Sequence, residues 1–559
     1  MCDPEYWVRH VREAVRFADG VTHLAEQGVT ACLELGPDGV LSGMGAECVP
    51  QMPFTPVLRK DRDESQSLVR ALAEVFVRGH AVDWAAFLAP SRPRLVDLPT
   101  YAFQRERYWI QPTKPQLSAS LDSETWRYRV VWSPVAVGSG VLSGAWLVVV
   151  PAGSAGDAWV GECVAGLARC GARPVVLELG GRECGRDVVA GRLRGVLAGE
   201  PDGFAGVVSL LALASGRDAG FGAVPVSVAL TLGLVQALGD VGVEARLWCV
   251  TRGAVAVSAS EQVSELDQSQ VWGLGRVAGL ELAGRWGGVV DLPGVVDARL
   301  VGRLAGVFAS GEGEVAVRAA GVFGRRVIRA GGAGGAAGVG GAGSWRVSGT
   351  VLVTGGTGGL GRRVARWLVG AGAEHVVLAS RRGPGAVGVE ELRAEFAAAG
   401  VGLSVVACDV GERSAVEGLL GCVPAGLPLS AVVHAAGVLD DGVLDGLSVG
   451  RFESVLRAKA EGARHLHELT RDMGLSAFVL FSSFSATVGG AGQANYAAAN
   501  AYLDALAGAR RAEGLPATSI AWGPWADDGM AVSSAEVSRT LRRTGMRPMD
   551  PEQALKALE

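Results

Sequence analysis

Four polar residues in the C-terminal part of the chain have the types and spacing of a catalytic group. Tyr496 and Asn500 are four residues apart in a strongly helical stretch, so they share one face of the predicted helix. Ser483 ends an apolar run shortly before them, and Lys459 is a lone lysine upstream. Tyrosine and asparagine alone would be an ordinary surface pair. Together with the serine, the lysine and a glycine-rich turn, they indicate catalysis beside a bound nucleotide.

The glycine-rich turn lies between Val351 and Gly361, where an apolar run leads into five glycines and then into a helical pattern. A strand that ends here must reverse tightly into a helix while its backbone approaches a pyrophosphate, and only residues without a Cβ permit both. Glycine makes up 82 of 559 residues, so the motif alone is only moderately specific. The predicted cofactor-binding residues of the turn are Thr354, Gly355, Thr357, Gly358, Gly359, Leu360 and Gly361.

The next predicted strand, His375–Ala379, indicates which dinucleotide binds. It ends in Ser380, Arg381 and Arg382, where a protein that binds the unphosphorylated dinucleotide usually has an acidic residue for the ribose 2′-hydroxyl. A serine and two arginines suit a 2′-phosphate instead, so NADPH is favoured over NADH. The alternative is that both arginines are ordinary solvated surface residues.

Further strands alternate with helices, which predicts a doubly wound parallel sheet with its ligand at the carboxyl ends of the strands. The strand at 404–408 is followed by Asp409 and Val410, and Asp409 is expected to accept a hydrogen bond from the adenine amine. The strand at 429–433 is followed by His434, which we interpret as structural. The residues expected to pass close beneath the cofactor are Ala435, Ala436 and Gly437.

From about Thr350 onward the sequence resembles the catalytic half of the ketoreductase domains of modular type I polyketide synthases, members of the short-chain dehydrogenase/reductase superfamily. Most of that superfamily has a lysine four residues after the tyrosine. This chain has Asn500 there and offers Lys459 from an earlier helix, the exchange seen in polyketide ketoreductases. The matching segments are Thr350–Gly361, Ser380–Gly383, His434–Gly437, Phe478–Ser483, Asn495–Asp504 and Ala521–Trp525.

The resemblance implies NADPH-dependent reduction of a β-ketoacyl thioester held by an acyl carrier protein on its phosphopantetheine arm. Tyr496 would be the general acid that protonates the β-carbonyl oxygen, and its free pKa of about 10 makes it a reluctant donor. A nearby Lys459 cation would lower the tyrosine pKa, while Ser483 would hydrogen-bond the same oxygen. Asn500 would hold lysine, water and backbone in register.

The resemblance also implies a stereochemical outcome. Leu439, Asp440 and Asp441 look like the signature of B-type ketoreductases, which give the D-β-hydroxy product. Two neighbouring positions agree with this type, because Val488 replaces the tryptophan of A-type domains and Asn495 precedes the tyrosine. Ala491 departs from the proline of many B-type domains, and Ala498 lacks the proline of epimerising domains, which favours the B1 subtype. The alternative is that the Asp-Asp pair merely caps a loop.

Residues 126–330 resemble the structural subdomain that polyketide ketoreductases place before their catalytic half. The strand pattern at Trp146–Val150 runs into Pro151–Gly156, which is similar to a dinucleotide turn that has lost its glycine spacing. We predict a degenerate Rossmann subdomain without nucleotide, a Gly-rich linker at 331–346 and a catalytic subdomain at 347–559, truncated at its C-terminus. The expected fold class is α/β, with two Rossmann-like doubly wound parallel sheets.

The first part of the chain resembles a piece of another enzyme. Tyr6–Arg12 and Leu33–Pro37 are similar to the C-terminal edge of an acyltransferase domain, and Leu98–Trp109 is similar to the linker that wraps back over a ketosynthase. We assign residues 1–55 to an acyltransferase remnant and 56–125 to the post-acyltransferase linker. This implies neighbouring ketosynthase and acyltransferase domains as partners within a homodimeric parent synthase.

Bulk properties exclude several other classes of protein. The formal net charge of −5 argues against nucleic-acid binding. Nine cysteines without C-x-x-C spacing fit a reducing cytoplasm, and no run has the length or flanks of a membrane span or a signal peptide. We therefore expect a cytoplasmic protein without a metal site.

The order of the segments predicts how far reduction proceeds, because it leaves no room for a dehydratase or an enoylreductase, and the module should stop at the alcohol. Residues 527–549 are expected to form a lid, and the helical pattern at Leu558–Glu559 suggests a fragment of a longer polypeptide. Two other functions stay open: a reductively silent scaffold segment, and a free-standing dehydrogenase of small alcohols. The intact catalytic residues disfavour the first, and the acyltransferase remnant disfavours the second.

Overall fold

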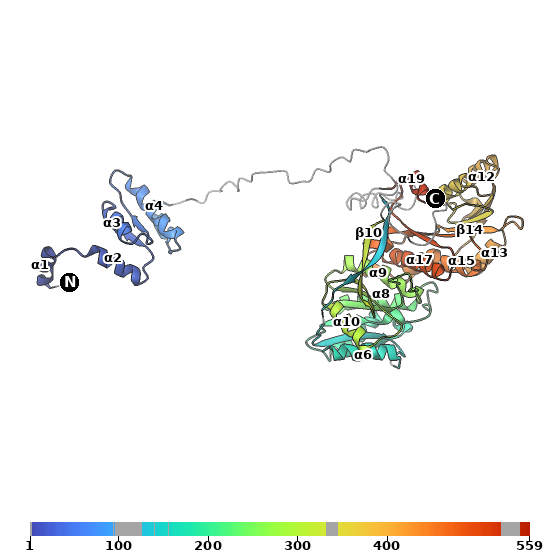
Figure 1. The fold of residues 1–559 in the computed structure, drawn as a ribbon, viewed down its shortest axis with the longest axis horizontal. Helices are drawn as coiled ribbons and strands as arrows, with labels where there is room; N and C mark the ends of the chain where they lie inside the picture. The colour runs from blue at the N-terminus through green and yellow to red at the C-terminus, as the bar shows by residue number, and fades with distance from the viewer. Residues whose placement is uncertain are drawn as a thin grey trace. The chain divides into compact units, whose positions relative to one another are not determined.

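The computed structural model describes residues 3–92, 94, 126–138, 140–154, 156–330, 345–526 and 548–558. The chain divides into two compact units, Met1–Thr113 and Lys114–Glu559, which are described separately below (Figure 1). Nearly all of the predicted lid and of the Gly-rich linker, and about half of the predicted post-acyltransferase linker, lie outside the described residues. Within the described ranges, no helix combines the length and the apolar character needed to cross a bilayer.

The first unit has a small parallel sheet in which β1 (Cys32–Glu34) pairs with β2 (Phe54–Pro56). Its buried apolar side chains are few, whereas many large ones, Trp7 and Leu35 among them, are exposed. Exposed apolar surface of this kind is typical of a face that contacts another part of a protein. The helices are α1 (Pro4–Arg12), α2 (Phe17–Glu26), α3 (Val40–Cys48), α4 (Glu64–Val77), α5 (Trp84–Leu88) and η1 (Ala89–Ser91).

The second unit contains two sheets, and the first has eight strands in the order β3-β10-β9-β8-β7-β6-β4-β5. Strands β4 to β9 are parallel, whereas β10 is antiparallel to both β9 and β3. β4 is buried along nearly all of its length, because helices cover both faces of a parallel sheet. The strands are β3 (Tyr128–Val135), β4 (Ala145–Pro151), β5 (Arg173–Leu179), β6 (Gly206–Ser209), β7 (Leu247–Arg252), β8 (Trp286–Leu292), β9 (Glu314–Arg318) and β10 (Gly321–Arg329).

The helices of this half are α6 (Ala158–Arg169), α7 (Arg186–Leu197), α8 (Val226–Asp240), α9 (Ser269–Glu281) and α10 (Ala298–Phe308), with short turns η3 (Gly181–Glu183), η4 (Leu211–Leu213) and η5 (Leu266–Gln268). α8 is buried almost all round and packs against both α7 and η7 (Leu444–Gly446) of the second half. Its run of apolar residues without a polar face therefore follows from burial on several sides.

The second sheet has six parallel strands in the order β13-β12-β11-β14-β15-β16. The chain moves outward from β11 to β13, then crosses to β14 on the other side of β11. Ligands bind at such a change of direction, outside the carboxyl ends of the strands. The strands are β11 (Thr350–Thr354), β12 (His375–Ser380), β13 (Gly402–Ala407), β14 (Leu429–His434), β15 (Ala477–Ser483) and β16 (Thr518–Trp522).

The helices of this half are α11 (Gly359–Gly370), α12 (Val389–Ala398), α13 (Arg413–Leu420), α14 (Val449–Leu456), α15 (Gly462–Thr470), α16 (Phe484–Val488), α17 (Ala494–Ala512) and α19 (Pro551–Lys556), with η6 (Gly383–Gly385) and the π-helical turn η8 (Arg457–Glu461). Helix α17 packs against α9 of the first half. One apolar core contains residues of both halves, including Trp272 and Tyr502, so the two sheets share a core.

Candidate active site

The glycine turn lies where β11 passes into α11, beside the segment that follows β14. Gly355 has a φ of +67°, and a Cβ there would lie 2.9 Å from the backbone oxygen of Ala435 and from Ala436 Cα. A Cβ on Gly361 would overlap the backbone oxygen of Gly355 and lie 2.6 Å from Gly356 Cα. Two predicted groups of cofactor residues thus meet at the carboxyl ends of β11 and β14, in a cradle that admits no side chains.

The end of β12 joins this cradle through hydroxyl groups. Thr357 donates a 2.8 Å hydrogen bond to Ser380 Oγ, which also accepts one of 3.1 Å from the amide of Gly383. Arg381 and Arg382 follow and are exposed. Neither guanidinium forms an ion pair with any residue that the structure describes, so both are available to an anion. The residues present therefore fit a dinucleotide with an additional phosphate.

Asp409 has a partner that the sequence did not indicate. Its Oδ2 lies 3.2 Å from Nη2 of Arg457, and its Oδ1 accepts a 3.0 Å hydrogen bond from the amide of Gly411. The backbone oxygen of Val410 lies 3.1 Å from Nδ1 of His465, also in a helix after β14. These contacts attach the β13 end of the predicted cofactor site to the helix region that carries Lys459.

His434 connects the glycine turn to that lysine. The ring is fully buried, and burial followed by the charge of Lys459 lowers its pKa to about 3, so the imidazole is neutral. The Thr354 hydroxyl donates to His434 Nδ1 at 2.7 Å, and His434 Nε2 donates to the backbone oxygen of Lys459 at 3.0 Å. The role of His434 in the structure is to hold the end of β11 against the lysine-bearing turn.

Lys459 lies in the π-helical turn η8, between α14 and α15. Such turns insert one residue into a helix and re-aim its side chains. Lys459 Nζ donates a 2.9 Å hydrogen bond to the backbone oxygen of Phe481 and lies 5.2 Å from the centre of the Tyr496 ring. Burial lowers the pKa of Lys459 to about 7, and the Asp504 carboxylate opposes this shift. The structure brings lysine and tyrosine together although 37 residues separate them in sequence (496 − 459).

Tyr496, Asn500 and Ser483 complete the predicted group. Asn500 Nδ2 donates to the backbone oxygen of Tyr496 at 2.8 Å, while Asn500 Oδ1 is buried and has no hydrogen-bond partner among the described residues. The sequence predicted a lowered tyrosine pKa, and this prediction was wrong for the isolated chain. Burial raises the pKa of Tyr496 to about 12, and hydrogen bonds with Asn500 and Ser483 oppose the rise. The phenol therefore holds its proton at neutral pH.

Ser483 caps α16 and has a neighbour that the sequence did not indicate. Its Oγ accepts hydrogen bonds from the amide of Ser485 at 3.2 Å and from Ser485 Oγ at 3.1 Å. Two arginines of the first half bind the next carbonyl groups, Arg276 at Ala486 (2.5 Å) and Arg325 at Thr487 (2.7 Å). No local sequence signal could have identified these arginines, because they lie more than 150 positions before the serine.

The predicted stereocontrol loop, Leu439 to Asp441, is bonded to the segment before Tyr496. Asp440 pairs with Arg451 at 2.7 Å, and its backbone oxygen accepts from Asn495 Nδ2 at 2.8 Å. Asp441 Oδ2 accepts from Gln493 Nε2 at 2.9 Å, and burial raises the pKa of the Asp441 carboxyl. Both acids therefore have structural partners that couple the loop to the N-terminal end of α17.

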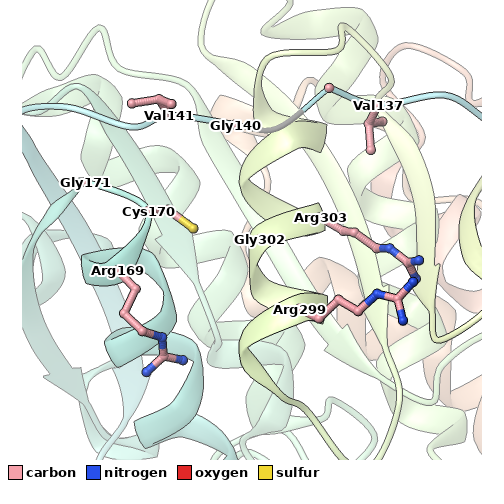
Figure 2. Close-up of a pocket in the computed structure, with 10 residues that line it drawn as sticks. Val137, Gly140, Val141, Arg169, Cys170, Gly171, Arg299, Gly302 and Arg303 are labelled. Carbon is pink, nitrogen blue, oxygen red and sulfur yellow. The ribbon is translucent and has the colours of Figure 1, made fainter.

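A cavity of about 620 Å³ lies elsewhere, in the first half between α6 and α10 (Figure 2). It contains none of the predicted site residues. Arg169 borders one side, and Arg299 and Arg303 project from α10 on the other, so the Arg169 guanidinium lies apart from the other two (Figure 2). Arg303 Nη1 donates to the backbone oxygen of Ala319 at 2.9 Å. Within the described ranges, no three His, Cys, Asp or Glu side chains are grouped so that they could hold a metal ion.

Family comparisons cover both halves of the second unit. Residues 349–527 match the KR domain family, and residues 144–327 match the Rossmann fold domain of the polyketide synthase extender module SpnB. The whole chain is 46% identical to polyketide synthase GfsA of Streptomyces halstedii and 42% identical to pikromycin polyketide synthase component PikAIII of Streptomyces venezuelae. It spans only 8% and 34% of the length of these two relatives.

Solved structures agree with these matches. An A-type ketoreductase from a modular polyketide synthase has a TM-score of 0.73 and 46% identity, over 78% of this chain and 90% of that one. A C2-type ketoreductase has a TM-score of 0.70 and 42% identity, over 78% and 92%. The two types share one fold, so the similarity confirms the α/β fold class but does not identify a stereochemical type. The chain belongs to the ketoreductases of modular polyketide synthases, oxidoreductases of the short-chain type that use a nicotinamide cofactor.

Proposed function

We propose that the chain uses NADPH to reduce a β-ketoacyl thioester, carried by an acyl carrier protein, to the D-β-hydroxyacyl thioester. The observation that carries the proposal is the convergence of Tyr496, Ser483 and Lys459 beside the glycine turn. A phenol, a hydroxyl and an ammonium close to a dinucleotide cradle form a site that can protonate a carbonyl oxygen while a hydride reaches its carbon. When bound, the reduced nicotinamide supplies that hydride.

The residues of the chain have separate tasks in this reaction. Gly355 and Gly361 admit the pyrophosphate, and Arg381 and Arg382 pair with the 2′-phosphate. Ser483 donates a hydrogen bond to the substrate carbonyl oxygen, and Tyr496, which is protonated at neutral pH, gives that oxygen its proton.

Lys459 and Asn500 support the proton transfer. The Lys459 ammonium stabilises the phenolate left on Tyr496 after it has donated its proton. Asn500 Oδ1, which has no hydrogen-bond partner among the described residues, would bind a water molecule that returns a proton toward the lysine.

The stereochemical part of the proposal, B type with a D product, rests on Leu439, Asp440 and Asp441, and the B1 subtype rests on Ala498. The loop holds its position through Arg451, Gln493 and Asn495 rather than through a cap of its own. Chiral analysis of the reduced product tests this assignment, and an L alcohol would overturn it.

The predicted domain boundaries and partners belong to the same proposal. We assign residues 1–55 to an acyltransferase remnant, 56–125 to its linker, 126–330 to the structural half, 331–346 to the Gly-rich linker and 347–559 to the catalytic half. The acyl carrier protein and the neighbouring ketosynthase and acyltransferase domains would be the partners, within a homodimeric synthase. The formal charge of −5 argues against a nucleic acid as a partner.

The experiment measures loss of NADPH absorbance with a β-ketoacyl thioester on an acyl carrier protein. Turnover supports the proposal, and no turnover would favour the reductively silent alternative.

The double variant Arg381→Ala, Arg382→Ala tests which cofactor is used. We expect its KM for NADPH to rise about 10- to 100-fold, since charge-assisted hydrogen bonds are lost, while its KM for NADH changes little. The control is Arg393→Ala in α12, whose guanidinium pairs with Glu390.

A further inference from the structure

We infer that Glu281, in the half without catalytic residues, is a positioning residue that fixes the two loops beside Tyr496 and so sets how the substrate is presented. Its carboxylate binds one amide from each loop. Oε1 accepts a 2.6 Å hydrogen bond from the amide of Gly492, and Oε2 accepts one of 2.6 Å from the amide of Leu444. One side chain of α9 thus joins two segments of the catalytic half. The inference rests on the proposed function.

The loop before α17 has little structure of its own. Residues 489–492 are Gly-Gly-Ala-Gly, and Gly489 and Gly492 have φ values of +83° and +84°. Glycines in this region give the backbone freedom but no side chains with which to fix itself. A Cβ on Gly489 would lie 3.1 Å from the backbone oxygen of Arg276, so the loop rests directly on α9. Its conformation therefore depends on contacts from outside, and Glu281 supplies one.

The second loop, 438–446, contains the predicted stereocontrol residues. It is bonded to the first loop, because the amide of Gly442 donates to the backbone oxygen of Gly492 at 2.7 Å. Two further hydrogen bonds join this loop to the residues just before Tyr496. Gln493 donates to the Asp441 carboxylate, and Asn495 donates to the backbone oxygen of Asp440. A shift of either loop would therefore change the walls of the substrate site relative to the phenol.

The position of Glu281 is unfavourable for an acid in its own helix. It is the last residue of α9, and a negative charge at a helix C-terminus opposes the helix dipole. The two bound amides compensate for this, and they also explain why a carboxylate is required. Glutamine has the same length but only one acceptor oxygen, so it would present an N–H group to one of the two amides.

The test compares Glu281→Gln with the wild-type chain and with the control Glu244→Gln, an exposed acid of the same half. We expect Glu281→Gln to raise KM for the thioester about tenfold, the effect of one lost charge-assisted hydrogen bond, and to raise the fraction of the minor hydroxyl isomer. KM for NADPH should stay as in the wild type. A residue that merely stabilises the fold would change both KM values together and leave the isomer ratio unchanged.

Hydrogen exchange gives a second measurement that does not depend on turnover. In Glu281→Gln we expect faster exchange in residues 438–446 and 489–492, and unchanged exchange in the glycine turn. Unchanged exchange in both loops, or an unchanged thioester KM and isomer ratio in an active enzyme, would overturn the inference. If the wild-type chain itself reduces no thioester, the proposed function fails, while the exchange experiment still decides whether Glu281 holds the loops.

Discussion

Burial shifts the pKa values of both Tyr496 and Lys459, upward for the phenol and downward for the amine. The phenol, with a pKa raised to about 12, carries a proton at neutral pH, and the amine, with a pKa lowered to about 7, titrates near neutrality. Asp504 favours the charged amine from one side, while Phe481 offers it a backbone oxygen. In the proposed mechanism, proton donation by the tyrosine is therefore easiest when the lysine is charged, because the ammonium stabilises the phenolate that remains.

Replacing Tyr496 by phenylalanine removes the donated proton and leaves the ring in place. We expect kcat to fall by about 10²- to 10⁴-fold, the usual contribution of a general acid. NADPH binding, measured by fluorescence titration, and the melting temperature should stay near the wild-type values. Tyr502→Phe, six residues later in α17, is the matched control and should retain turnover. Full activity of the Tyr496 variant would refute its role.

The charge of Lys459 predicts a pH dependence. The amine is protonated below its pKa of about 7 and loses its proton as pH rises through that value, so kcat should decline above about pH 7. Lys459→Arg keeps a positive charge throughout this range and should shift the decline to higher pH. Steady-state rates from pH 6 to 9 measure both profiles. A wild-type rate that is constant to pH 9 would contradict the assigned role of the ammonium.

At the scale of elements, two turns decide the site. The turn after β11 is built from glycines packed against Ala435. The turn after β4 is its counterpart in the first half, and a Cβ on its Gly153 would meet nothing within 4 Å. There the amide of Gly153 donates a 3.1 Å hydrogen bond to Glu178, so a carboxylate of the chain already binds that turn. The π-helical turn η8 is the other decisive element, because it directs Lys459 toward Tyr496.

Gly361→Ala tests the glycine turn. The new Cβ would overlap the backbone oxygen of Gly355, so the turn must move. We expect Kd for NADPH to rise at least about tenfold, since the phosphates lose their close approach to the backbone. The control is Gly370→Ala at the other end of α11, where a Cβ has nothing within 4 Å. It should bind NADPH normally and gain about 0.4–1 kcal/mol of stability. Equal affinities would contradict the proposed cradle.

For the second unit as a whole, the noncatalytic half acts as a support for the catalytic one. Arg276, Arg325 and Glu281 bind backbone groups of the segments that flank Ser483 and Tyr496. α9 and α17 pack so closely that a Cβ on Gly273 would overlap the backbone oxygen of Ala497 and lie 2.6 Å from Ala498 Cα. Because the halves share a core as well, they should unfold together.

Gly273→Ala tests this packing. Forcing α9 away from α17 should destabilise the chain by about 1–3 kcal/mol, as other overpacked sites do, and lower turnover with it. The control is Gly191→Ala in α7, where a Cβ meets nothing within 4 Å and stability should not fall. Urea unfolding followed by circular dichroism gives both free energies. Two separate transitions within the second unit, or an unchanged midpoint for Gly273→Ala, would show that its halves are independent.

Local patterns in the sequence were enough to predict the type of fold. Apolar runs alternating with helical patterns, glycines at strand ends and the Tyr496–Asn500 spacing are short-range features, and backbone geometry translates them directly into elements. The sheet that carries the glycine turn was predicted in this way, whereas the first Rossmann-like sheet and the polyketide synthase relationship were predicted from the family resemblance; all three are confirmed. The residues predicted for the glycine turn and the catalytic group also lie together, although their roles stay predictions until the variants are measured.

The tertiary structure decided what the sequence could not specify. The pKa of Tyr496 rises rather than falls because burial depends on every neighbour of the ring, which no motif states. Glu281, Arg276 and Arg325 lie more than 150 positions from the catalytic segments that they bind, and only the packing of α9 on α17 brings them there. Spacing along the chain thus determined which residues could do the chemistry. The fold determined their protonation and their support, since electrostatics and loop position depend on distance in space.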